Sequence, residues 1–89
     1  VFSFNDNMAA GVYDYFIEKN LTIGKDAFVA GFDNQVVCEY MNPPLTTMQI
    51  PLIEIGKRSA EELLAFINNE KSTKENISIP CSLIERKSV

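Results

Sequence analysis

Two short apolar runs separated by a helical repeat decide the fold: VFSFNDNMAAGVYDYFIEKNLTIGKDAFVAGFDN (residues 1–34). Residues 1–4 predict a short buried strand and residues 27–32 predict a second one, because continuous apolarity is typical of strands buried on both faces in parallel sheets. Between them, apolar side chains recur every three to four residues, which predicts a helix that runs to about Lys19. This order of strand, helix and strand is typical of α/β proteins.

Polar residues mark both ends of this helix. Asn5, Asp6 and Asn7 are residue types that cap helix N-termini, because their side chains accept hydrogen bonds from the free N–H groups of the first turn. Asn20 tolerates the left-handed conformation in which many helices end. We therefore expect Asp6 to act as a cap and Asn20 to stop the helix.

The remainder of the chain continues the alternation. Residues 34–42 predict a short irregular or helical connection, and residues 45–48 predict a third short strand. Pro51 suits the first turn of a helix, where its missing N–H costs nothing. A long helix follows, with an apolar stripe made of Leu52, Ile55, Ser59, Leu63, Phe66 and Ile67.

The C-terminal residues complete an α/β pattern. Residues 68–76 predict a charged surface loop, and the alternating apolar residues of 77–83 predict a final strand. Pro80 places that strand at an edge or a bulge, because proline cannot donate to a sheet ladder. The expected fold class is α/β, with a mostly parallel sheet flanked by helices.

Composition limits the classes of function. The 89 residues are 46% hydrophobic and 22% charged, which is typical of one small globular domain. The net charge of −4 argues against nucleic-acid binding by this chain. No apolar run approaches the roughly 20 residues of a membrane span, and no secretory signal is present. The chain starts without Met on a strand-like run, so we expect it to be a fragment of a longer protein.

Reactive residues are scarce. The chain has no histidine and two cysteines, Cys38 and Cys81. We therefore expect neither a zinc site nor a histidine-activated nucleophile. We also expect that the chain is not an enzyme and that it holds no metal or cofactor. We expect both cysteines to be reduced and buried, since cysteine commonly behaves as a small core residue.

Two polar side chains follow the first two predicted strands. Asn5 comes after the first and Asp33 after the second, and ligands of open α/β sheets bind outside the carboxyl ends of the strands. If the strands are parallel neighbours, an amide and a carboxylate meet on one rim, a pair that suits a polyhydroxylated ligand. The plain alternative is that both residues form turns or caps. A general acid–base pair of Asp6 and Asp33 is the weakest of the interpretations.

Several motifs together point to a family. They are Asn-Asp-x-Met-Ala-x-Gly (5–11), Gly-Phe-Asp (31–33), Pro-Pro-Leu-Thr-Thr (43–47), the helix that contains Gly56, and Leu-x-x-Arg-x-Ser (83–88). In this order and spacing, across the whole chain, they closely resemble the C-terminal part of the periplasmic binding protein-like effector-binding domain of LacI/GalR-family bacterial transcriptional regulators.

The resemblance implies an architecture and a set of partners. Members carry a helix-turn-helix DNA-binding domain and a two-lobed regulatory domain, which dimerises and binds a small effector, usually a sugar or a purine. Residues 1–48 and 77–89 would belong to the C-terminal lobe, and residues 49–76 to the crossing and a helix of the N-terminal lobe. The protein would be a cytoplasmic homodimer that binds operator DNA only through the helix-turn-helix domain missing from this chain.

The resemblance also implies roles for single residues. Asn5 and Asp33 match the polar residues that contact the effector, and Leu52 matches an apolar or aromatic residue placed against it. The predicted dimer interface comprises Ala10, Tyr13 and Met41. The predicted hinge comprises Thr47, Met48, Gln49, Ile50 and Pro51, and the three prolines around it fix the crossing between the lobes.

Two alternatives stay open. A secreted transport receptor shares this fold, although the Pro-Pro-Leu-Thr-Thr motif and the apolar dimer face argue against it. The chain can also be an interaction module without an independent ligand site, because half of the cleft lies outside it.

Overall fold

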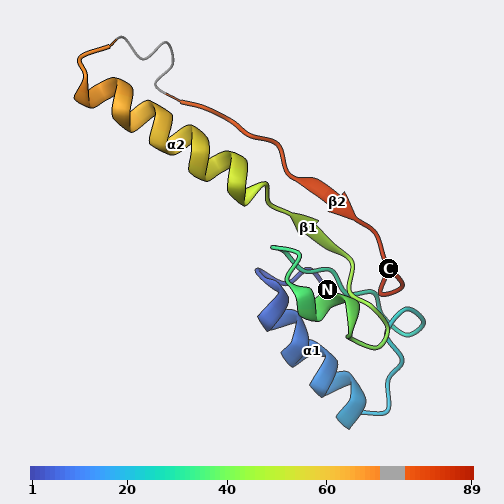
Figure 1. Ribbon diagram of the computed structural model, residues 1–89. Helices are drawn as coiled ribbons and strands as arrows, with labels where there is room; N and C mark the ends of the chain where they lie inside the picture. Colours follow the sequence, from blue (N-terminus) through green and yellow to red (C-terminus); the bar gives the residue numbers. More distant parts are fainter. Residues whose placement is uncertain (71–75) are drawn as a thin grey trace. The chain divides into compact units, whose positions relative to one another are not determined.

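The chain forms two compact units in the computed structural model, which describes residues 1–70 and 76–89 (Figure 1). Unit 1 comprises Val1–Ile50 and Ser82–Val89, and unit 2 comprises Pro51–Cys81. The elements of unit 1 are helix α1 (Asp6–Glu18), the 3-10 helix η1 (Val36–Glu39), and strands β1 (Thr47–Gln49) and β2 (Ser82–Ile84). Unit 2 holds helix α2 (Leu52–Ile67). The predicted loop over 68–76 lies largely outside the described residues.

Helix α1 begins at an asparagine cap. Asn5 Oδ1 accepts a hydrogen bond of 2.8 Å from the backbone N–H of Met8, which satisfies one of the free donors of the first turn. The helix ends at Glu18, and Asn20 follows with a φ of 55°. The predicted helix and its left-handed stop at Asn20 are therefore confirmed.

One face of α1 supplies two residues, Ala9 and Tyr13, to a small core. The buried apolar residues of unit 1 are Ala9, Tyr13, Ile23, Val29, Cys38 and Leu45. Burial raises the pKa of Tyr13, so its hydroxyl stays neutral and donates a hydrogen bond of 2.8 Å to the carbonyl of Pro43. Burial, together with the neighbouring Asp6, raises the pKa of Cys38 to about 12, which keeps this thiol protonated. Both cysteines are free, but only Cys38 is buried, and the prediction that Cys81 is buried is wrong.

Unit 1 pairs its extended segments in parallel, through single bridges rather than long strands. Phe2 pairs with Ala30, Ala30 with Thr46, and Asp33 with Gln49. Strand β2 then pairs antiparallel with β1. The predicted α/β class with mostly parallel pairing is confirmed, whereas the predicted lengths of the strands are wrong.

The N-terminal segment faces the other way from the prediction. Ser3 is buried, while Phe2 is 70% and Phe4 82% exposed. Successive side chains of an extended segment alternate between its two faces, so an inward Ser3 turns both rings outward. The expectation of a buried apolar strand over residues 1–4 is therefore wrong. At the other end of the chain, β2 begins only after Pro80, which has no N–H to donate.

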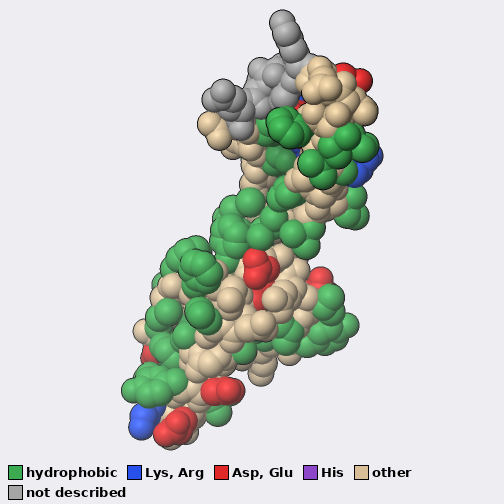
Figure 2. Space-filling view, turned by 90° about the vertical axis from the view of Figure 1, so that its left-hand side faces the viewer, with side chains coloured by type: hydrophobic (Ala, Val, Ile, Leu, Met, Phe, Trp, Pro, Cys, Tyr) green, Lys and Arg blue, Asp and Glu red, His purple; other side chains and the backbone are tan. Residues whose placement is uncertain are grey.

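Helix α2 of unit 2 begins where the sequence predicts, but none of its residues is buried. It follows Pro51, and Arg58 lies 3.2 Å from Glu62 and 3.8 Å from Glu61 on its surface. No residue between Leu52 and Ile67 is buried, so the apolar stripe of this helix lies on the surface of the unit. Figure 2 shows hydrophobic side chains on the surface of both units.

Gly31 lies where the chain has no room for a side chain. A Cβ at this position would collide with Asp6 Oδ1 and would lie 3.0 Å from Leu45 Cδ2. We expect Gly31→Ala to lower the free energy of unfolding by about 1–3 kcal/mol, because the added methyl overpacks a buried site. Gly11→Ala is the matched control, since a Cβ there meets nothing within 4 Å.

Denaturant unfolding of the full-length protein measures both effects. Gly11 is an exposed residue inside α1, where alanine is about 0.5–1 kcal/mol better than glycine. The two substitutions are therefore expected to shift stability in opposite directions. A Gly31→Ala variant as stable as Gly11→Ala would contradict the close packing of Gly31.

Candidate ligand-binding site

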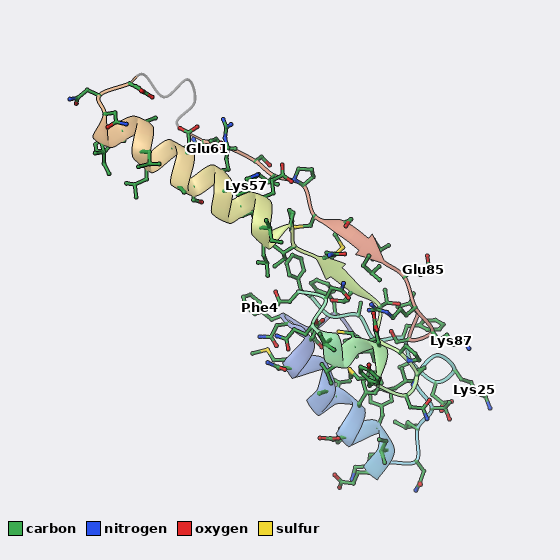
Figure 3. The ribbon with its side chains drawn as sticks, viewed as in Figure 1. Phe4, Lys25, Lys57, Glu61, Glu85 and Lys87 are labelled. Carbon is green, nitrogen blue, oxygen red and sulfur yellow. The ribbon has the colours of Figure 1, made fainter. Side chains whose placement is uncertain are left out.

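A pocket of about 420 Å³ opens on unit 1. Its lining comprises Phe2, Phe4, Asn5, Phe32 and Asp33. Phe4 directly precedes the cap of α1 and is labelled in Figure 3. The volume lies within the range of roughly 300–1,000 Å³ that is common for small-molecule sites, and the walls are mostly apolar with two polar groups.

The two polar groups of the pocket are the two side chains expected to meet there. Asn5 uses its carbonyl oxygen for the α1 cap, so its side-chain NH₂ group remains available as a donor. The carboxylate of Asp33 accepts no hydrogen bond from a residue within 1–70 and 76–89, so its acceptor capacity is available too. The parallel bridges bring the segments of Asn5 and Asp33 together, as the rule for strand ends predicted.

The backbone at Asp33 is strained. Asp33 has a φ of 115° and Asn34 a φ of 56°, both in the left-handed region that non-glycine residues seldom adopt. Each such residue costs on the order of 1–3 kcal/mol and persists where the surroundings determine its position. The backbone N–H of Asp33 donates to the carbonyl of Met48 at 2.9 Å, which fixes the turn against β1. Asp33 therefore forms the turn through its backbone, and its side chain takes no part in it.

Asp6 lies beneath this turn and is not a cap. It is fully buried, and its Oδ1 accepts a hydrogen bond of 2.6 Å from the hydroxyl of Thr47. Its Oδ2 accepts one of 2.8 Å from the backbone N–H of Gln35. The prediction that Asp6 caps the helix is wrong, because Asn5 holds the cap and the side chain of Asp6 accepts from Thr47 and Gln35 instead.

Thr46 of the Pro-Pro-Leu-Thr-Thr motif bonds to the C-terminal residues of unit 1. The backbone N–H of Thr46 donates to Ser88 Oγ at 2.8 Å, and Ser88 Oγ donates to the carbonyl of Val29 at 2.6 Å. The backbone N–H of Arg86 donates to Thr46 Oγ1 at 2.8 Å. The sequence contains both motifs, but its only local signal for the hydrogen bonds between them is the pair of hydroxyl side chains.

The other predicted ligand and hinge residues occupy the boundary of the units. Leu52 is the first residue of α2 and is 68% exposed, in unit 2. Thr47, Met48 and Gln49 form β1, Ile50 is the last residue of unit 1 in that stretch, and Pro51 is the first of unit 2. The roles of Leu52 as a ligand contact and of this segment as a hinge stay predictions, as do the lobe boundaries.

The residues predicted for a dimer interface lie on or near the core. Ala10 and Met41 are half-buried, and Met41 packs against the core cluster. Tyr13 is 5% exposed, so the chain itself covers most of this ring. Val36 and Tyr40, close to Met41 in the chain, are 76% and 79% exposed. The dimer interface stays a prediction.

Residues 1–70 and 76–89 were also compared with the requirements of a membrane span and of a metal site. No helix in this part of the chain is long and apolar enough to cross a bilayer. The same residues contain no group of three or more His, Cys, Asp or Glu arranged to hold a metal ion.

Comparison with known proteins places this chain in a family. The model of the periplasmic binding protein-like domain matches residues 1–89. The HTH-type transcriptional repressor PurR of Vibrio atlanticus (strain LGP32) is 38% identical, over 100% of this chain and 27% of PurR. The Lac repressor dimer bound to operator and the anti-inducer ONPF is 32% identical with a TM-score of 0.90, over 98% of this chain and 26% of that one. A LacI family regulator from Enterococcus faecium with bound ribose is 36% identical with a TM-score of 0.84, over 99% and 33%.

The three matched proteins are all longer than this chain, and all belong to one class of protein. This chain spans 27% of the length of PurR, and all three proteins are transcriptional regulators, so they do not support the transport-receptor alternative. The chain belongs to the periplasmic binding protein-like domain family, and it is similar to part of LacI-type transcriptional regulators.

Proposed function

We propose that the protein containing this chain is a repressor regulated by a small sugar, and that the pocket with Asn5 and Asp33 contacts this effector. The observation that carries the proposal is the pairing of an available amide with an available carboxylate between three phenylalanine rings. The chain would contribute binding and regulation, with no catalytic role.

The chemistry of the pocket suits a monosaccharide. The hydroxyls of a sugar are donors for the two oxygens of the Asp33 carboxylate, while the Asn5 NH₂ group donates to a hydroxyl or ring oxygen. The C–H faces of the sugar ring are apolar and suit the exposed rings of Phe2 and Phe4. The ribose-bound regulator from Enterococcus faecium supports a pentose as the first candidate.

Regulation would act through a second copy and a second domain. We place Ala10, Tyr13 and Met41 at a homodimer interface, and operator DNA on a helix-turn-helix domain outside this chain. Effector binding would favour one arrangement of the lobes about the hinge, and the dimer would transmit that shift to the DNA-binding domains. The protein would act in the cytoplasm, where its operator is.

Calorimetric titration of the full-length protein with D-ribose tests the proposal. We expect saturable binding with one site per chain, because the ring can contact carboxylate, amide and phenylalanine together. D-Mannitol is the control, since this open-chain polyol offers hydroxyls without a ring face. Absence of binding by D-ribose and by a panel of other monosaccharides would contradict a sugar effector and favour an interaction module without a ligand site.

A further inference from the structure

Arg86 reaches the strained turn from the C-terminal end of the chain. Its guanidinium Nη2 donates to Asn34 Oδ1 at 2.9 Å, and Nη1 donates to the carbonyl of Leu45 at 2.8 Å. The Arg86 side chain is 14% exposed, and Glu39 lies 3.7 Å from Nη2. Because the guanidinium is a rigid planar fork, these contacts hold the side chain of Asn34 in one place.

Asn34 is the residue through which this contact acts on the pocket. It follows Asp33 directly, and the two residues share the left-handed conformation. The backbone N–H of Asn34 is also held, by Thr47 Oγ1 at 3.3 Å. A residue pair in this conformation relaxes when its partners are removed, and relaxation at Asn34 would turn the preceding Asp33 carboxylate.

We propose that Arg86, acting through Asn34, is a positioning residue for the Asp33 carboxylate in the ligand pocket. Arg86 itself does not line the pocket. The inference rests on the proposed function, since it assigns to Arg86 a part in ligand affinity. The proposal explains why the arginine of the Leu-x-x-Arg-x-Ser motif contacts a turn that is distant in the sequence.

A purely structural role for Arg86 has to be distinguished from a role in positioning Asp33. Arg86 also bonds to the carbonyl of Leu45, so its removal would disturb the attachment of the C-terminal residues. Substitution of Asn34 avoids this, because it removes the acceptor and leaves the bond between Arg86 and Leu45 in place. Asn34→Gly fits best, since glycine accepts a φ of 56° without strain.

Two further variants make the comparison specific. Asn20→Gly is the matched control, because Asn20 has a φ of 55°, is exposed, and lies after α1, outside the pocket lining. Asn34→Asp keeps an oxygen acceptor for Arg86 and adds a charge of opposite sign. It therefore tests whether the contact itself restores the function that Asn34→Gly loses.

The first measurement is calorimetric titration of the full-length variants with D-ribose. We expect Asn34→Gly to weaken binding about tenfold, Asn20→Gly to leave it unchanged within about twofold, and Asn34→Asp to recover most of the loss. The midpoint of thermal unfolding is expected to fall further in Asn34→Gly, which loses the bond from Arg86, than in Asn20→Gly. Equal affinity of Asn34→Gly and Asn20→Gly would overturn the inference.

The second measurement needs no ligand. Hydrogen exchange of the Asn34 and Gln35 amides is expected to accelerate about tenfold or more in Asn34→Gly and to stay unchanged in Asn20→Gly. If the wild-type protein bound no sugar, the proposed function would fail while this comparison still decided whether the contact with Arg86 holds the turn. Unchanged exchange at both amides would show that Arg86 does not hold the turn.

Discussion

Asp6→Ala is expected to lower the free energy of unfolding of unit 1 by about 3 kcal/mol, although no surface feature would change. The carboxylate of Asp6 is fully buried and accepts hydrogen bonds from the hydroxyl of Thr47 and the backbone N–H of Gln35. Alanine leaves both donors without an acceptor and opens a void beside Gly31. The Thr47 hydroxyl is a buried donor, which costs about 1–3 kcal/mol when left unpaired, and the loss of the partly buried bond from the Gln35 N–H adds to this cost.

Asp14→Ala is the matched control for this prediction. Asp14 is an exposed carboxylate on the same helix, and its removal is expected to change stability by no more than about 0.5 kcal/mol. Thr47→Val removes the hydroxyl that donates to Asp6 and accepts from the Asn34 N–H. Its effect should be less than additive with that of Asp6→Ala, because both substitutions break the bond between Thr47 and Asp6. Denaturant unfolding of the full-length protein compares the variants. Equal stability of Asp6→Ala and Asp14→Ala would contradict the buried network.

The helices could be predicted from the sequence because their signals are local. The apolar repeat, Asn5 at the cap, Asn20 at the stop and Pro51 before α2 each act within a turn of the residue concerned. The meeting of Asn5 and Asp33 in one pocket could also be predicted, since it needs only a parallel pairing of two neighbouring segments.

The buried polar network could not be predicted, because its bonds join distant parts of the sequence. Asp6 has the sequence neighbours of a helix cap, and only the hydroxyl of Thr47 shows why it turns inward. Arg86 and Asn34 are separated even further along the chain. A local pattern reports the type of a side chain and its spacing, but not the partner that a folded backbone brings to it.

The apolar runs misled for a related reason. Phe2 and Phe4 have the composition of a buried strand, yet their rings are exposed and line the pocket. The stripe of α2 has the spacing of a core face, yet it is exposed within unit 2. Apolar character predicts contact with something apolar, and in this chain it does not distinguish the core from a pocket wall or an uncovered face.

Asp33→Ala is expected to weaken effector binding about 100-fold or more while unit 1 stays folded. Two hydrogen bonds from sugar hydroxyls to a carboxylate would both be lost, and each is worth about 1.5–3 kcal/mol. The fold should survive because the Asp33 side chain bonds to no other residue in the described part of the chain, and its backbone N–H still donates to Met48. Asp33→Asn keeps one acceptor and tolerates the positive φ, so it should bind with intermediate affinity.

Calorimetric titration of the full-length wild-type protein and Asp33→Ala with D-ribose, side by side, tests the central claim most directly. Asp14→Ala controls for the loss of one negative charge far from the pocket lining. The predicted result is saturable binding by the wild type and Asp14→Ala, and binding at least about 100-fold weaker by an Asp33→Ala variant that still folds. Equal affinity of D-ribose for the wild type and Asp33→Ala would show that this pocket is not the effector site.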